Sequence, residues 1–227
     1  SGMKNTASGY GALLSNTTGY ENTATGSRAL ASNTTGYFNT AIGNLTLYSN
    51  TTGYSNTASG YQALYSNTEG FYNTASGFRA LLSNTTGHSN TASGYTALMM
   101  NTEGFQNTAF GNYALNSNTT GNRNIAIGGE ALSNNVRGGG NVAIGYQAGY
   151  SETGHNKLYI SNSSTTNLIY GDFSTGDLSL GQTSGTVSAL NDFSVANNLY
   201  IDGTALTNNE GTLEWDGEAL GGGESFT

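Results

Sequence analysis

The sequence lacks several residues on which ordinary domains depend. It has 227 residues with no cysteine and no proline, and only 9% of its residues are charged. Without cysteine there is no disulfide framework, thiolate zinc site or thiol nucleophile. Without proline the chain is not a collagen. Because no apolar run approaches the ~20 residues of a membrane-spanning helix, we expect no membrane insertion.

Hydrophobic residues are also scarce, which argues against a conventional globular core. They make up 35% of a chain rich in Asn, Thr and Ser that also contains 34 glycines. Aromatic residues nevertheless reach 11%, whereas glycine-rich disordered chains are poor in them. The composition therefore predicts a regular structure that does not rely on a large core.

An internal repeat of 17 residues explains this composition. Counted from a recurring Asn, each unit approximates Asn-Thr-Ala-x-Gly-x-x-Ala-Leu-x-Ser-Asn-Thr-Thr-Gly-x-x. Position 5 is glycine in all nine units, and position 15 is glycine in the eight complete ones, so we expect two turns in each unit. The Asn at position 1 is found at Asn5, Asn22, Asn39, Asn56, Asn73, Asn90, Asn107, Asn124 and Asn141.

The repeat predicts an all-β fold, a parallel β-solenoid. A 17-residue unit is too short for a helix pair and has no 3.6-residue apolar period. It fits one coil with two short strands and two turns, stacked about 4.8 Å above the preceding coil. Alternation at positions 2 to 4 places alanine on one face and residues such as Ile125 and Ile127 on the other.

The apolar content of one coil is small. With one leucine and two alanines per coil, we expect that a single stack cannot enclose a sufficient core. We therefore predict that several chains pack closely around a shared axis, so that each completes its core with its neighbours.

Polar and aromatic rows should run along such a stack. The Asn residues of positions 1 and 12 would line up coil on coil, where their amides can bond each other or the turns. Position 16 is mostly aromatic, position 6 holds a sparser aromatic row, and position 7 is variable. We expect the aromatic rows mainly to stabilise the stack. The candidate surface-recognition residues are Tyr20, Tyr37, Tyr54, Phe71, Phe105, Arg28 and Arg79.

Two runs carry a family resemblance. Asn141-Val142-Ala143-Ile144-Gly145 and Asn124-Ile125-Ala126-Ile127-Gly128 resemble the Asn-x-Val-Ala-Ile-Gly motif of YadA-like head repeats in trimeric adhesins. The resemblance implies a homotrimeric parallel β-roll for residues 5 to about 150. The 17-residue unit is longer than the usual repeat of that family. It also resembles repeats of tail-fibre-like proteins of phages and phage-derived injection systems, in which a β-rich stalk follows.

The chain changes character near residue 150, which divides it into a repeat shaft at 1–150 and an acidic segment at 151–227. The shaft has five basic and four acidic side chains, whereas the second segment has one lysine and ten acidic side chains. Short strands are predicted at 157–161, 167–171, 177–181 and 198–203. Segments 199–206 and 213–220 are related, each with an Asp-Gly turn signal. We interpret 151–227 as an intertwined β-stalk or tip-proximal domain, with a flexible end at 221–227.

The sequence offers little chemistry, and we predict that the chain is not an enzyme and uses no cofactor. His88 and His155 lie at unrelated phases of the repeat, which disfavours a catalytic triad or a histidine metal site. Two pairs of carboxylates, Asp172 with Asp177 and Asp202 with Asp216, are most simply explained as acidic residues of solvated turns. A cation bound by Asp202 or Asp216 is a further hypothesis. The net charge of −8 disfavours nucleic acid.

These features predict a trimeric fibre protein for adhesion or receptor binding, located outside the cell or on a particle. Expected partners are two further copies, a cell-surface receptor or glycan, and a larger fibre or baseplate assembly. The length of the unit and the stalk favour a tail fibre of a phage or injection system. A trimeric-autotransporter-type adhesin and a purely structural spacer are the alternatives. The threonine row beginning with Thr6, Thr23 and Thr40 also raises the hypothesis of an ice-binding face.

Overall fold

The computed structural model describes residues 2–180, 198–201, 204–209, 212–215 and 218–219. The chain divides into two compact units, Ser1–Gly185 and Thr186–Thr227, which are described separately. Over the described ranges all regular structure is β-strand. No helix long and apolar enough to cross a membrane occurs in them.

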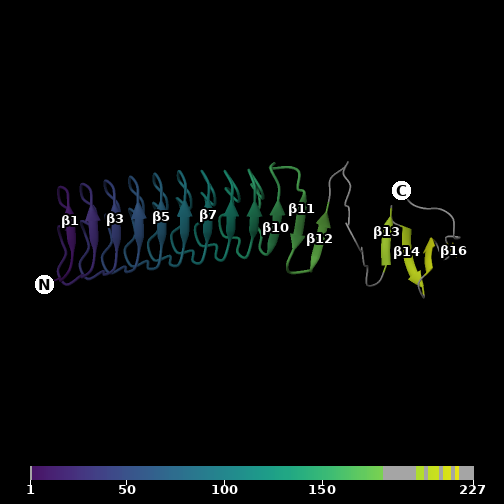
Figure 1. The fold of residues 1–227 in the computed structure, drawn as a ribbon, viewed down its shortest axis with the longest axis horizontal. Helices are drawn as coiled ribbons and strands as arrows, with labels where there is room; N and C mark the ends of the chain where they lie inside the picture. Colours follow the sequence, from purple (N-terminus) through teal and green to yellow (C-terminus); the bar gives the residue numbers. More distant parts are fainter. Residues whose placement is uncertain (1, 181–197, 202–203, 210–211, 216–217, 220–227) are drawn as a thin grey trace. The chain divides into compact units, whose positions relative to one another are not determined.

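Nine strands of three residues, one at positions 2 to 4 of each unit, form a parallel β-solenoid (Figure 1). Each strand pairs in parallel with the strand of the next coil, so that residues 17 apart lie side by side, as Ala75 does with Ala92. The prediction of a solenoid with 17-residue coils is confirmed. The strands are β1 (Thr6–Ser8), β2 (Thr23–Thr25), β3 (Thr40–Ile42), β4 (Thr57–Ser59), β5 (Thr74–Ser76), β6 (Thr91–Ser93), β7 (Thr108–Phe110), β8 (Ile125–Ile127) and β9 (Val142–Ile144).

The expectation of a second strand in each coil is wrong. The Ala-Leu segment is a series of turns, with positive φ at positions 7 and 9, as at Arg79 (54°) and Leu81 (52°). Bonds still connect this segment to the next coil, because the N–H of Leu81 donates to the Ala97 carbonyl at 3.0 Å. Left-handed backbone costs an L-residue about 1–2 kcal/mol. Here it turns the buried leucine inward.

Each chain encloses a narrow core of its own. The strand alanines and the Ala-Leu pair point inward, and from Ala24 to Ala148 they form one buried cluster. The leucines of position 9, from Leu30 to Leu132, have no exposed area. The cluster stays narrow because alanine dominates it, and polar residues fill the remaining interior.

Buried asparagines make up that polar interior, as the two predicted rows. In the fifth coil, Asn73 and Asn84 each donate an Nδ2 hydrogen to the carbonyl oxygen of Gly87, at 2.9 Å in both cases. Asn84 also donates to Oδ1 of Asn67 in the preceding coil at 2.7 Å. Asn73 Oδ1 accepts the backbone N–H of Asn90 in the next coil at 3.0 Å. The two rows therefore close the coils and connect neighbouring coils, except that the position-12 row is interrupted after Asn118, whose Oδ1 has no partner.

The two invariant glycines serve different purposes. Position 5 has φ between +116° and +142°, as in Gly77, a region that L-residues rarely adopt. Position 15 has ordinary backbone angles, but a Cβ at Gly87 would clash with Oδ1 of Asn84 and with the Gly104 carbonyl. Glycine there lets the buried amides reach the main chain.

The sheet continues beyond the last repeat through β10 (Lys157–Ile160), β11 (Ile169–Asp172) and β12 (Asp177–Leu180). Strand β10 pairs in parallel with β9, whereas β11 and β12 are antiparallel. Position 9 of the ninth coil is Gly149 instead of leucine. A Cβ there would lie 2.9 Å from the ring of Tyr159, which packs against the core cluster. An aromatic side chain thus ends the leucine row.

The second unit contains a separate antiparallel sheet of β13 (Asn198–Ile201), β14 (Thr204–Asn209), β15 (Thr212–Trp215) and β16 (Glu218–Ala219). Ile201 pairs with Thr204, and Trp215 with Glu218. The related segments 199–206 and 213–220 therefore each contribute an antiparallel pair, as their Asp-Gly signals indicate. The predicted flexible end at 221–227 lies outside the described residues.

The amide rows lead to a stability prediction for Asn84→Asp. The aspartate keeps the shape of asparagine but cannot donate, so a carboxylate oxygen would face the oxygens of Asn67 and Gly87. We expect a loss of about 3 kcal/mol of unfolding free energy at neutral pH. Burial raises the pKa of such a carboxyl, so the loss should shrink as the pH falls from that raised value to about pH 4, below which the carboxyl is protonated in both the folded and the unfolded chain. Denaturant unfolding at neutral pH and below about pH 4 measures the effect.

Asn44→Asp is the matched control. Asn44 is exposed and makes only a 3.5 Å contact with the Ser27 carbonyl, so this change should alter the unfolding free energy by less than about 0.5 kcal/mol. Equal effects of the two substitutions would contradict the structural role of the amide rows.

Candidate recognition surfaces

The aromatic residues of position 16 stack on one another along the solenoid, as predicted. Neighbouring rings are nearly parallel, with centroids 5.0 Å apart from Tyr54 to Phe71 and 4.7 Å apart from Phe71 to His88. In the sequence His88 interrupts the Tyr and Phe residues of position 16, but in the structure its ring continues their stack. The members are Tyr20, Tyr37, Tyr54, Phe71, His88 and Phe105.

The stacking limits what this row can bind. Both faces of each ring from Tyr37 to His88 are covered by the rings above and below. Position 17 adds edge contacts, from Phe38 to Tyr37 and from Tyr72 to Phe71. Burial among these groups raises the pKa of the Tyr37 phenol. A ligand would meet ring edges and hydroxyls, so the geometry favours a stabilising role for the row.

The two predicted arginines lie apart from that stack, because position 7 follows the strand and position 16 precedes it. Arg79 is engaged within the coil surface. Its Nε donates to Gln62 Oε1 at 2.9 Å, and its guanidinium lies 5.1 Å from the centroid of the Phe78 ring. Phe78 itself stacks between Tyr61 and Tyr95 in the row of position 6. Arg28 instead lines a cavity with Tyr10 and Tyr48.

The structure presents a third surface, which contains none of the candidate recognition residues named from the sequence. We call it the outer sheet face; it consists of the outward side chains at positions 2 and 4 of β1 to β9 and their partners on β10 to β12. From β1 to β6 it carries threonine and serine, except for Ile42. From β7 onward it is apolar except for Thr108 and Gly171, and several of its large side chains are exposed, including Phe110 (54%) and Leu178 (60%). The apolar members are Phe110, Ile125, Ile127, Val142, Ile144, Leu158, Ile160, Ile169, Leu178 and Leu180. The replacement of Thr and Ser by Ile and Val at these positions is the sequence signal for it.

Titratable side chains gather at the end of the solenoid. The Tyr159 hydroxyl donates to Glu152, and burial together with this bond raises the pKa of the phenol. Lys157 forms an ion pair with Asp172, which holds the pKa of Asp172 well below its usual range and raises that of the lysine. Ser174 also donates to Asp172. These polar side chains pair with one another, as expected of a structural cap at the end of the solenoid, which we call the end cap.

The other candidate groups do not converge on one site. His88 lies in the aromatic stack, and Nδ1 of His155 accepts the backbone N–H of Gly139 at 3.0 Å. Within the described ranges no three His, Asp or Glu side chains gather as metal ligands would. Asp202 and Asp216, the hypothetical cation ligands, lie outside the described residues.

Comparison with protein-family models, curated proteins and solved structures finds no match for the chain. Its function therefore has to be argued from the geometry of its surfaces.

The aromatic stack makes a prediction for Phe71→Ala. The change removes two stacked contacts, with Tyr54 and His88, and an edge contact with Tyr72. We expect a loss of about 2 kcal/mol of unfolding free energy. Tyr146→Ala is the control, because Tyr146 is 54% exposed and should contribute less than about 0.5 kcal/mol. Denaturant unfolding measures the stability of both variants. Equal stability of the two would show that the aromatic stack does not stabilise the fold.

The ion pair of the end cap makes a prediction about pH. Because the folded pKa of Asp172 is lowered, its stabilising contribution is present above about pH 4 and is lost as the pH falls through the folded value. Protection of β10 and β11 against hydrogen exchange, corrected for intrinsic rates, should therefore fall in acid.

Lys157→Met should remove most of this pH dependence. Lys4→Met is the control, since it breaks the exposed ion pair of Lys4 with Glu21, which should contribute little. Unchanged acid sensitivity in Lys157→Met would contradict the assignment.

Proposed function

We propose that the chain is part of a homotrimeric fibre that attaches a particle to a cell surface, as a tail fibre of a phage or contractile injection system does. The apolar half of the outer sheet face carries this proposal. Contiguous exposed apolar side chains mark interaction surfaces in soluble proteins when the patch is large. The resemblance of the repeats to trimeric adhesin heads and tail-fibre-like proteins supports the choice of partner.

The geometry of the face suits association between copies of one chain. The outward side chains are in register over β7 to β9, so a second copy can present matching rows. Symmetric closed assemblies are the commonest form of homo-oligomer. In a trimer, Ile127 and Ile144 would face the shared axis, and the strands of β10 to β12 would extend the same contact into the stalk.

The assembly is tested by light scattering on the wild-type chain and on Ile127→Glu. We expect the wild type to have three times the 23.4 kDa mass of one chain, whereas the variant should dissociate because a carboxylate cannot be buried unpaired at the axis. Thr120→Glu is the control, since Thr120 is exposed and the equivalent positions of the neighbouring coils hold one acidic and one basic side chain, Glu103 and Arg137. A folded wild-type monomer would overturn the trimer.

Attachment is tested separately with the fluorescently labelled trimer on a panel of bacterial cells. Saturable binding to some strains is expected of a receptor-binding fibre. A trimer that binds none of them would favour a spacer that carries another binding module.

The hydroxyl half of the outer sheet face favours a second candidate function, ice binding. Thr6, Thr23 and Thr40 are paired in register, so successive residues of a row are one strand spacing apart, about 4.8 Å. The rows of positions 2 and 4 lie two residues apart along each strand, about 6.6 Å. Both distances are of the same order as the oxygen repeats of ice. Thermal hysteresis measured on the wild-type chain distinguishes this function, because a fibre whose face is buried in a trimer should show none.

A further inference from the structure

On the surface next to position 7, the second coil carries smaller side chains than the first and third coils. Position 6 is Ser27, between Tyr10 of the first coil and Asn44 of the third. Position 10 is Ala31, between Leu14 of the first coil and Tyr48 of the third. Two small residues in the same coil therefore interrupt the surface rows of large side chains.

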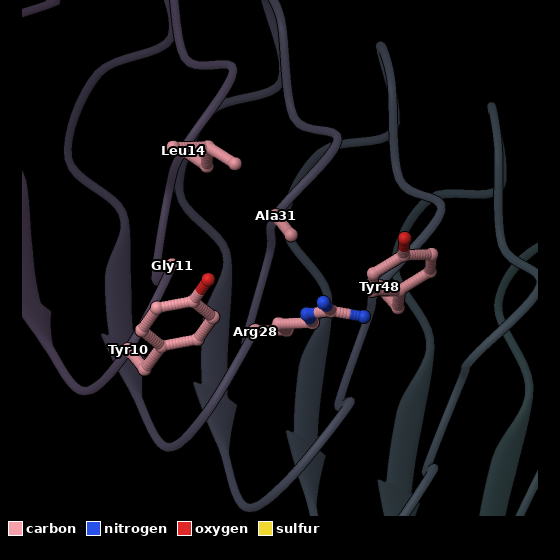
Figure 2. Close-up of a pocket in the computed structure, with 6 residues that line it drawn as sticks. All are labelled: Tyr10, Gly11, Leu14, Arg28, Ala31 and Tyr48. Carbon is pink, nitrogen blue, oxygen red and sulfur yellow. The ribbon is translucent and has the colours of Figure 1, made fainter.

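This departure leaves a cavity of about 300 Å³. Figure 2 shows the Arg28 side chain extending towards Tyr48, with Ala31 next to it and with Tyr10 and Leu14 on the opposite side of the cavity. Gly11 completes the lining, and it is the one glycine at position 7 of the repeat. The volume is at the lower end of the range for small-ligand sites, which suits a single sugar ring.

The surroundings of the Arg28 guanidinium differ from those of Arg79, the equivalent residue of the fifth coil. Arg79 has nearly the same backbone angle, with φ of 54° against 56°, but it bonds Gln62 and lies over Phe78. The described residues give the Arg28 side chain no hydrogen bond and no ion pair, and no lining residue of its cavity is acidic. Arg28 therefore presents a positive charge with free donors.

We propose that the Arg28 cavity binds a sugar acid, a monosaccharide unit with a carboxylate, of a cell-surface polysaccharide. A guanidinium binds a carboxylate through two parallel N–H bonds. The tyrosine rings offer apolar faces for the C–H groups of a sugar ring and hydroxyls for its polar edge. The inference deepens the proposed attachment function and rests on it for the source of the ligand.

The test is a titration of the full chain with glucuronate, galacturonate and N-acetylneuraminate, followed by NMR, with glucose and inorganic phosphate as comparison ligands. We expect at least one sugar acid to bind, and glucose and phosphate to bind at least about tenfold more weakly. Arg28→Gln should weaken binding by at least about tenfold, whereas Arg79→Gln, at the same position of the fifth coil, should leave it unchanged.

Ala31→Tyr provides a second variant that leaves Arg28 in place. Tyrosine occupies the equivalent position in the two following coils, at Tyr48 and Tyr65, so the fold accommodates it. It should fill the cavity and abolish binding. A wild-type chain that binds no sugar acid, equal effects of the two arginine variants, or phosphate binding as tight as that of the sugar acids would each overturn the proposal.

Light scattering on the same samples separates this result from that of the proposed function. A trimer without sugar-acid binding would refute the cavity assignment alone. A monomer that binds sugar acids would refute the trimer alone.

Discussion

The carbonyl oxygen of the position-15 glycine is the point at which the solenoid is held together. In the fifth coil Gly87 accepts one amide hydrogen from Asn73 and one from Asn84, and the oxygens of the same two amides accept N–H groups from the next coil. A buried amide bonded on both sides avoids the free-energy cost of an unpaired polar group. This arrangement requires glycine at position 15 and asparagine at positions 1 and 12, and it keeps successive coils in register.

Because the interior needs only these amides, two alanines and a leucine, the other positions of the repeat are free to vary. The same backbone therefore presents several different surfaces along one chain. Position 16 carries a stack whose ring faces cover each other, whereas the outer sheet face changes from hydroxyl-bearing to apolar near β7. In the second coil, small residues leave the charge of Arg28 exposed beside two tyrosines.

At the end of the solenoid the repeat also changes in the interior. Gly149 replaces the leucine of the repeat, and the ring of Tyr159 occupies the space. The parallel sheet can then continue into β10 and turn into the antiparallel strands β11 and β12. The ion pair of Lys157 with Asp172 holds the first of these antiparallel pairs.

The sequence by itself determined the period, the inward alanines, the asparagine rows and the stacked aromatic row, because identical spacing over nine units leaves stacking as the one arrangement that places like residues together. Tertiary structure decided the rest. The leucines of position 9 adopt φ of 49° to 52°, a conformation that leucine disfavours locally and that their burial in the core offsets. The different surroundings of Arg28 and Arg79 depend on side chains one coil away. Only the folded stack brings residues 17 apart into contact, so it alone shows which charge is paired and which is free.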